Sequence, residues 1–314
     1  MAEKVKLHRP WMVAVWPGMG HVALNAGYYL LSKLEMGVLA ELDAGDLFDI
    51  DHVEVKAGMV QPGRKPRNRF FVWNDPEKER DLVVFLGEAQ PPIGRFPFCK
   101  QLVAYAQDLG IERVFTFAAM ATRMHPESSA RIFGAATDEA NLAELRRLDV
   151  ELLEEGNIGG LNGVLLGVAM EAGLHGMCLL GEMPHVFAQL PFPKASLAVL
   201  ETFSTIAGIE IDFSDLTEQA KNADEQLGEL LARVEEAYGR QTGNEDVEGI
   251  LSSDASESAE ENELTTADRK RIERLFNQSQ EDRSKAFLLK RELDRLNVFK
   301  QYEDRFLDLF QKPG

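Results

Sequence analysis

One stretch near the N-terminus decides the predicted fold: Trp11-Met12-Val13-Ala14-Val15-Trp16-Pro17-Gly18-Met19-Gly20, followed by an amphipathic run from His21 to Met36. A short apolar run, a glycine turn and an amphipathic run predict a β-strand, a loop and an α-helix. Gly18 and Gly20 allow positive φ angles and a close approach of the backbone to a ligand or a neighbouring chain. The free N–H groups at the start of the helix would point into this loop, which makes it a candidate anion site.

The same alternation of strand and helix continues along the chain. Apolar runs predict further strands, and amphipathic runs between them predict helices. The predicted strands are residues 38–42, 53–55, 70–73, 82–86, 114–119 and 176–181, and the predicted helices are residues 96–109, 138–148, 164–172 and 194–207. This order predicts an α/β fold: a three-layer sandwich with a mostly parallel sheet covered on both faces.

The composition changes sharply after residue 240. Residues 241–263 hold eight acidic and no basic or aromatic side chains, so they predict a disordered acidic linker. Thr265 then starts a new helix, with Asp268 three residues later as a capping partner. Apolar side chains recur at intervals of three and four through residues 264–314. We therefore expect a core domain (1–240), a linker (241–263) and an amphipathic helical tail that folds back on the core, pairs with another subunit's tail or docks on a partner protein.

Charge and cysteine content limit the class of protein. The 314 residues carry a formal net charge of -18, so nucleic acid and anionic membranes are poor partners. Cys99 and Cys178 are isolated thiols, which favour a reducing compartment and no disulfide framework. No stretch approaches the roughly 20 apolar residues that span a bilayer, and the N-terminal residues lack a long apolar region. We expect a cytoplasmic protein.

Polar residues follow several of the predicted strands. In an open parallel sheet, ligands bind beyond the carboxyl ends of the strands, so these residues define a candidate ligand pocket or subunit interface. The candidates are Gly18, Gly20, His21, Glu88, Arg123, Asn157, Asn162, Glu182 and His185. No catalytic role is assigned to any of them.

The glycine loop has two interpretations. Residues 18–23 match the relaxed G-x-G-x-x-G/A fingerprint of dinucleotide-binding folds, and Glu41 or Asp43 would then contact a ribose hydroxyl. The alternative is a structural turn. The chain has no nucleophile elbow, Walker loop, H-E-x-x-H helix or Cys–His metal spacing, so we expect no cofactor and no metal.

Three motifs in order resemble one protein family. They are residues 16–20, the glycine-rich stretch 156–163, and residues 180–185 followed by Pro191-Phe192-Pro193-Lys194-Ala195. Together they resemble the proteasome assembly chaperone family, in its bacterial and archaeal branch, over residues 10–240. The resemblance implies a phosphorylase/hydrolase-like α/β core, self-association with a trimer favoured, and a role in holding other proteins.

The resemblance also implies a difference from archaeal relatives, which are thought to engage proteasome rings through a C-terminal hydrophobic–Tyr–any tripeptide. This sequence ends Gln311-Lys312-Pro313-Gly314, which does not match that tripeptide. The leading hypothesis is a self-associating protein that is not an enzyme. The alternatives are a binding protein or phosphorylase-like enzyme for a nucleoside or phosphate-type ligand, with Glu182, His185 and Arg123 contacting it, and a dinucleotide-binding protein.

Overall fold

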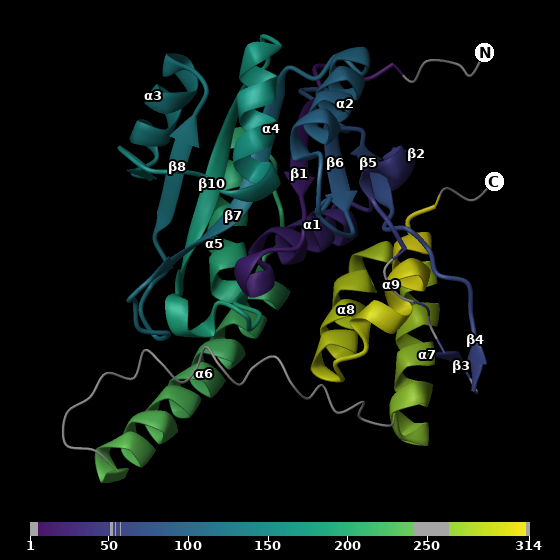
Figure 1. The fold of residues 1–314 in the computed structure, drawn as a ribbon, viewed down its shortest axis with the longest axis vertical. Helices are drawn as coiled ribbons and strands as arrows, with labels where there is room; N and C mark the ends of the chain where they lie inside the picture. Colours follow the sequence, from purple (N-terminus) through teal and green to yellow (C-terminus); the bar gives the residue numbers. More distant parts are fainter. Residues whose placement is uncertain (1–5, 51–52, 54, 57, 242–263, 312–314) are drawn as a thin grey trace. The chain divides into compact units, whose positions relative to one another are not determined.

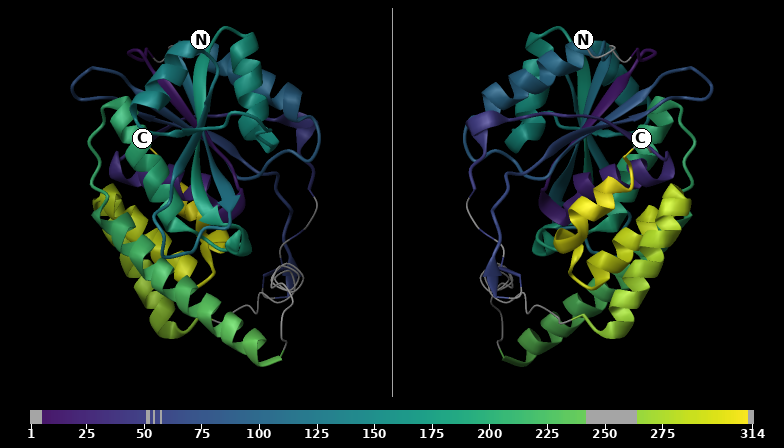
Figure 2. Two further views of the ribbon diagram at one scale, coloured as in Figure 1. Left: turned by 90° about the vertical axis from the view of Figure 1, so that its left-hand side faces the viewer. Right: turned by 90° about the vertical axis from the view of Figure 1, so that its right-hand side faces the viewer.

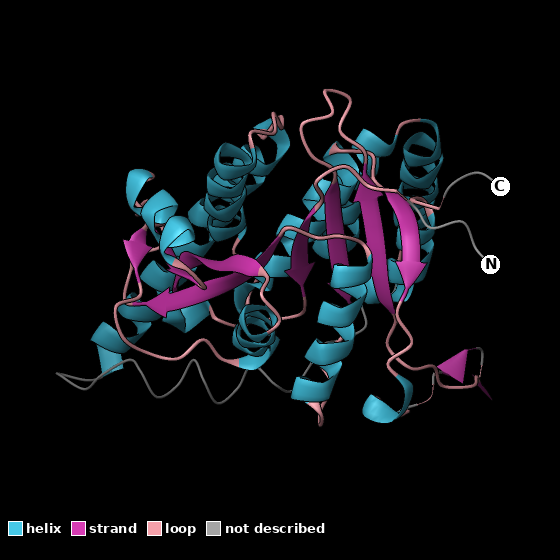
Figure 3. Cartoon of the chain, turned by 90° about the horizontal axis from the view of Figure 1, so that it is seen from above, coloured by secondary structure: helices cyan, strands magenta, loops and turns pink. Residues whose placement is uncertain are grey.

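A computed structural model describes residues 6–50, 53, 55–56, 58–241 and 264–311 (Figure 1). Eight strands form one sheet in the order β2-β5-β6-β1-β7-β10-β8-β9, and Figure 3 shows helices flanking the strands. The strands are β1 (Trp11–Val15), β2 (Gly37–Glu41), β5 (Asn68–Trp73), β6 (Leu82–Gly87), β7 (Arg113–Thr122), β8 (Ile132–Ala136), β9 (Glu151–Leu152) and β10 (His175–Pro184). The predicted α/β class is confirmed.

The sheet is mixed, with parallel strands around β1. β1 pairs in parallel with both β6 and β7, so that Val13 lies opposite Val84 and Phe115. β5 runs antiparallel to β6 and to β2. The continuous apolar runs seen in the sequence correspond to strands buried on both faces, as is typical of parallel sheets.

The chain forms two compact units. Unit 1 comprises residues 1–17, 36–117 and 134–179, and unit 2 comprises residues 18–35, 118–133 and 180–314. The domain limits at residues 240 and 264, which come from composition, stay predictions. The predicted linker lies outside the described residues, apart from Gln241 at the end of a helix.

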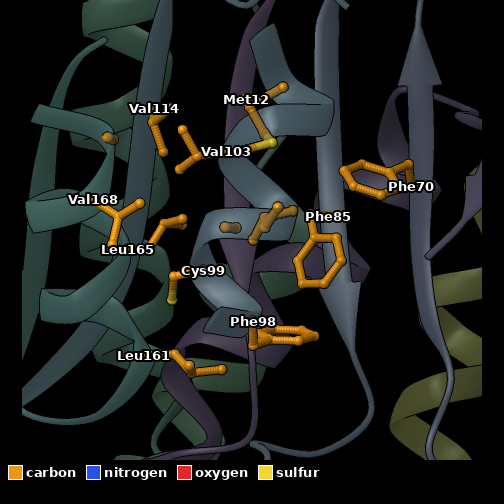
Figure 4. Packing of buried hydrophobic residues seen from close by; sticks show 14 of the residues in the cluster. Met12, Phe70, Phe85, Phe98, Cys99, Val103, Val114, Leu161, Leu165 and Val168 are labelled. Carbon is orange, nitrogen blue, oxygen red and sulfur yellow. The ribbon is translucent and has the colours of Figure 1, made fainter. Parts of the chain in front are cut away.

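The apolar core of unit 1 lies between strands of the sheet and the helices α2 (Arg95–Asp108) and α4 (Gly160–Glu171). The unit also contains α3 (Glu139–Arg147) and a separate pair of short strands, β3 (Val55–Lys56) and β4 (Met59–Val60). Figure 4 shows side chains of β1, β6, α2 and α4 meeting in this core, among them Phe85, Cys99 and Leu165. Cys99 and Cys178 are fully buried, and burial raises the pKa of each thiol to about 12. Neither thiol is therefore reactive in the folded chain.

Unit 2 is mostly helical. It contains α1 (Val22–Lys33), α5 (Pro193–Ala207), α6 (Ser214–Gln241), α7 (Thr266–Glu281), α8 (Ala286–Arg295) and α9 (Phe299–Asp308). α5 packs against α1 and α6. Thr265 and Asp268 form a reciprocal capping box at the start of α7, as the sequence predicts.

The tail packs on α1. The Tyr29 ring lies edge-on to Phe287 with centroids 4.5 Å apart, and the Tyr28 hydroxyl donates to Glu303 Oε1 at 2.7 Å. Ser32 Oγ accepts from the N–H of Phe287 at 3.0 Å. Figure 2 shows α8 and α9 beside α1. Of the three arrangements that the sequence leaves open for the tail, the structure has the one in which it folds back.

Among the residues that the structure describes, no helix has the length and apolar character needed to cross a membrane.

Candidate functional site

The glycine loop after β1 is a tight turn that contacts the segment after β10. Gly20 has φ +60°, and a Cβ placed there would lie 2.7 Å from the sulfur of Met183. The N–H of Gly20 donates to the carbonyl of Ala188, and its carbonyl accepts from the N–H of Phe192, both at 2.9 Å. Gly18 is extended at φ -167° and has open space around it. The polar backbone groups of Gly20 are therefore already bonded within the protein.

His21 is the N-cap residue of α1 and has φ +51°, without a capping bond from its side chain. Partial burial lowers the pKa of its imidazole, and Lys290 and Lys300 lower it further, whereas Asp294 raises it. These charged groups all belong to the tail. The structure therefore places this candidate residue next to α8 and α9.

Glu182, buried near the end of β10, forms an ion pair with the half-exposed Arg131. Its carboxylate accepts from Arg131 Nη2 at 2.6 Å and Nε at 2.9 Å, and from Thr122 Oγ1 at 2.7 Å. The N–H of Arg131 donates to it as well, at 3.2 Å. The bonds from Arg131, followed by those from Thr122, lower the pKa of Glu182 to about 2 against the opposing effect of burial. The carboxylate is thus fixed in its ionised form.

The loop between β7 and β8 is held from two sides. His185 Nδ1 donates to the carbonyl of Thr122 at 2.9 Å. Lys194 Nζ donates to the carbonyls of Pro126 and Ser128 and forms an ion pair with Asp224 at 2.6 Å. Together with the Glu182 bonds, these contacts fix a loop whose outer side chains are exposed.

Unit 1 contains the third candidate carboxylate, Glu88. It accepts from Arg69 Nη2 at 3.0 Å, from Arg64 Nη1 at 2.7 Å and from the N–H of Arg67 at 2.9 Å. The side chains of Glu88 and Arg69 are only 4% and 2% exposed. Glu88 therefore fastens residues 64–69 to the end of β6.

The second glycine-rich stretch joins the same unit. The Gln90 side chain donates to the carbonyl of Pro17 at 3.0 Å and accepts from the N–H of Leu161 at 3.3 Å. Asn157 is exposed, and the buried Oδ1 of Asn162 has no hydrogen-bond partner among the described residues. Gln90 thus links the stretch to the chain just before Gly18.

Within unit 2 the structure brings together four of the predicted residues, because Gly20 packs on Met183, and Glu182 and His185 both bond to Thr122, the neighbour of Arg123. The other predicted residues in this unit are Gly18 and His21. Glu88, Asn157 and Asn162 belong to unit 1.

Sequence patterns do not reveal Arg131 or Arg69 as partners of the acids, because neither lies in a motif. Lys194 does lie in the third family motif, and its place there is the one signal that pointed to it.

Two shallow hollows lie on the surface, and none of the nine candidate site residues lines either of them. One, of about 340 Å³, lies in unit 1 along residues 41–48 and 65–67. Glu41 and Asp43, the ribose contacts of the dinucleotide interpretation, do line this hollow. The other, of about 520 Å³, follows α7. Within the described parts of the chain, no group of three or more His, Cys, Asp or Glu side chains could hold a metal ion.

The chain resembles known proteins over most of its length. A model of the PAC2 family matches residues 12–231. An uncharacterised protein of Methanocaldococcus jannaschii, MJ1210, is 28% identical over 243 residues, which cover 75% of this chain and 90% of that protein.

Solved structures share the fold. PbaB of Pyrococcus furiosus, described as an archaeal proteasome activator, is 28% identical with a TM-score of 0.63, covering 73% of this chain and 96% of that one. PbaA of the same organism, described as an archaeal homolog of proteasome-assembly chaperone, is 26% identical with a TM-score of 0.56, covering 74% and 97%. A PAC2 family protein of Streptomyces avermitilis is 26% identical with a TM-score of 0.59, covering 70% and 95%.

The tail lies beyond the part of the chain that the family model matches. The family match ends at residue 231, before α7 begins. The helices α7, α8 and α9 therefore lie outside the part of the chain that the family model matches.

Proposed function

The chain belongs to the PAC2 family, the family of bacterial and archaeal proteasome assembly chaperone homologues, and from this premise we propose that it is a self-associating protein that binds other proteins and catalyses no reaction. PbaB is described as a proteasome activator and PbaA as a homolog of a proteasome-assembly chaperone. A role among protein complexes of this kind, in the cytoplasm, is the corresponding expectation for this chain.

The observation that carries this proposal is how the two candidate acids, Glu182 and Glu88, are bonded within the protein. A catalytic acid or base needs access to a substrate proton and a pKa near the working pH. Glu182 is 2% exposed, its bonds are taken up by Arg131 and Thr122, and its pKa lies near 2. Glu88 is bonded to arginines in the same way. Both carboxylates therefore hold loops in place, which suits a rigid binding surface better than a reaction centre.

The glycine loop supports the same proposal. A phosphate cradle needs unbonded backbone N–H groups directed at the ligand. The N–H of Gly20 is bonded to Ala188 instead, and Met183 fills the space beside its Cα. The loop is built for contact between protein segments, so a dinucleotide is not the expected ligand.

Light scattering coupled to size-exclusion chromatography of the full chain tests the proposal. We expect a homo-oligomer at micromolar concentration, with a trimer as the favoured state. A monomer at every concentration up to 100-fold higher would overturn self-association. Added nicotinamide cofactors are expected to leave the tryptophan fluorescence and the melting temperature unchanged.

The unit 1 hollow favours one alternative, a small-molecule binding site. Its volume of about 340 Å³ falls within the range of ligand sites, and Lys65 and Arg67 supply positive charge beside the buried ring of Phe48. Lys65 and Arg67 already bond to the carbonyl of Gly45 and to Glu41, which weakens the case. A thermal-shift screen with inorganic phosphate, nucleosides and nucleotides decides it: a shift that Lys65→Ala abolishes would support binding there.

A further inference from the structure

α7 carries a basic stripe on the side that faces away from the rest of unit 2. The stripe is lined by Ala267, Lys270, Arg271, Arg274, Leu275 and Gln278, and it bounds the groove of about 520 Å³. These positions recur at helical spacing and share one face of the helix. The opposite face holds Ile272, Phe276 and Ser279, all fully buried. α7 is therefore anchored through one face and presents the other to solvent.

The charges of this stripe are unbalanced. Arg271 pairs with Glu292 at 3.0 Å. Lys270 and Arg274 are exposed, and neither forms an ion pair or hydrogen bond with another described residue. The formal net charge of the chain is -18, so the two unpaired cations beside the partly exposed Leu275 form a locally basic surface on an acidic protein. The surface is suited to a helix that presents carboxylates at the same spacing.

α6 presents a row of carboxylates of this kind. Glu218, Glu225 and Glu229, the acidic stripe, are separated by seven and four residues and so lie on one face of the helix. Side-chain exposure is 66% at Glu218 and 71% at Glu229. The face opposite to the stripe is buried through Leu216 and Leu227. Among the described residues, Glu218 and Glu229 make only long ion pairs, at 3.8 and 3.5 Å.

We propose that the basic stripe on α7 of one copy of this chain binds the acidic stripe on α6 of a second copy. This inference rests on the proposed self-association and names the surfaces that carry it. The two stripes are different patches of one chain, so the contact is head-to-tail, and repeating it generates a closed ring whenever the rotation between copies closes. A trimer is one such ring. Since α7 lies outside the part that the family model matches, assembly through it would set this chain apart from any relative that lacks the tail.

Several charges must act together for this contact to hold. A single exposed ion pair contributes little, whereas Lys270 and Arg274 opposite three carboxylates form a network. The stems of the lysine and arginine side chains also cover apolar surface. At 0.1 M ionic strength the attraction between exposed charges decays over a distance of about 10 Å, and this distance shortens as salt is added. The assembly is therefore expected to weaken as the salt concentration rises.

Charge reversal in the full chain tests the pairing. Lys270→Glu/Arg274→Glu makes both stripes acidic, and Glu225→Lys/Glu229→Lys makes both basic. Each variant alone is expected to dissociate, with the dissociation constant raised at least about tenfold, as light scattering over a dilution series measures it. The chain that combines all four substitutions restores opposite charges and is expected to assemble again.

Mixing the two double variants gives a sharper readout. In an equimolar mixture each variant attracts only the other, so neighbouring copies must alternate and a closed ring of three copies cannot form. The charge-matched control, Arg95→Glu/Lys100→Glu on the exposed surface of α2, should assemble like the wild type. Unchanged circular dichroism would show that all variants are folded.

The possible outcomes distinguish a failure of the proposed self-association from a failure of the pairing of α6 with α7. A wild-type chain that is monomeric at all concentrations contradicts the proposed self-association itself. A wild-type oligomer that survives both double reversals contradicts only the pairing of α6 with α7, as does failure of the fourfold variant to reassemble when it is folded.

Discussion

Replacing Glu182 by Gln removes the buried charge from its ion pair with Arg131 while keeping the shape of the side chain. The lowering of the Glu182 pKa from 4.5 to about 2 corresponds to about 3 kcal/mol. The Arg131 side chain is 53% exposed, so solvent screens part of this interaction. We therefore expect Glu182→Gln to lower the free energy of unfolding at pH 7 by about 2 kcal/mol. The loss is not recovered by the amide, because its NH₂ group is a donor and cannot accept from the donors of Arg131.

The dependence on pH gives the decisive comparison. A carboxylate whose pKa is depressed by folding stabilises the folded state above its unfolded pKa of 4.5, and this contribution is lost as the pH falls through about 2. At pH 3.5 the unfolded state is already largely protonated, so the difference between wild type and Glu182→Gln should shrink by about 1.4 kcal/mol relative to pH 7.

Urea unfolding followed by far-ultraviolet circular dichroism at pH 7 and pH 3.5 measures both quantities. The control is Glu127→Gln, which neutralises a 71% exposed glutamate on the same loop and should change stability by no more than about 0.5 kcal/mol. A difference for Glu182→Gln that is below about 0.5 kcal/mol at pH 7, or equal at the two pH values, would refute the assigned role of the pair.

Three further predictions concern the glycine loop, the tail and pH. Gly20→Ala should cost about 1–3 kcal/mol of stability in thermal or urea unfolding, because of its positive φ and the clash at Cβ, whereas Gly18→Ala should be near neutral; equal effects would contradict the turn geometry. Tyr28→Phe should cost about 1.5–3 kcal/mol and speed proteolysis of the tail, since buried Glu303 loses a donor, and an unchanged cleavage rate would count against this docking. The pKa of His21 is lowered on folding, so stability should fall as the pH drops below 6.5; His21→Gln should flatten that slope between pH 8 and pH 5.5, and an identical slope would disprove the cause.

The sequence predicts those parts of the fold that depend on local patterns. Buried parallel strands are continuous apolar runs, so β6 at Leu82–Gly87 is recognisable without knowledge of its neighbours. The capping box at Thr265 needs only a residue three positions further on. Both features are contained within a few residues, and both are confirmed.

Features that depend on distant residues could not be predicted. Glu182 and Arg131 are 51 positions apart, and nothing in either neighbourhood indicates their pairing. β8 lies partly in a stretch without clear periodicity, because its residues are only partly buried. The antiparallel direction of β5 likewise depends on the path of the chain through residues 45–67. The sequence predicts one strand there, at 53–55, and the structure has the separate pair β3 and β4.

The candidate site also combines features that local sequence predicts with features that depend on distant residues. Both Glu88 and Glu182 come just after a predicted strand. The structure places Glu88 directly after β6, whereas Glu182 lies inside β10, which continues to Pro184, and both side chains are buried. Whether such an acid faces a substrate or an arginine is decided by which loop folds over it. Residue type and spacing hold no information on that choice, so the pocket and interface interpretations stayed equally open in the sequence.

The distribution of tryptophan between the two units has an optical consequence. Trp11, Trp16 and Trp73 are the three tryptophans of the chain, and all belong to unit 1. Emission excited at 295 nm therefore comes from unit 1 alone, while far-ultraviolet circular dichroism is dominated by the helices of unit 2. If the two signals change at different denaturant concentrations, the units unfold separately. Tryptophan fluorescence therefore reports on unit 1 without an added label, and the tail makes no contribution to it.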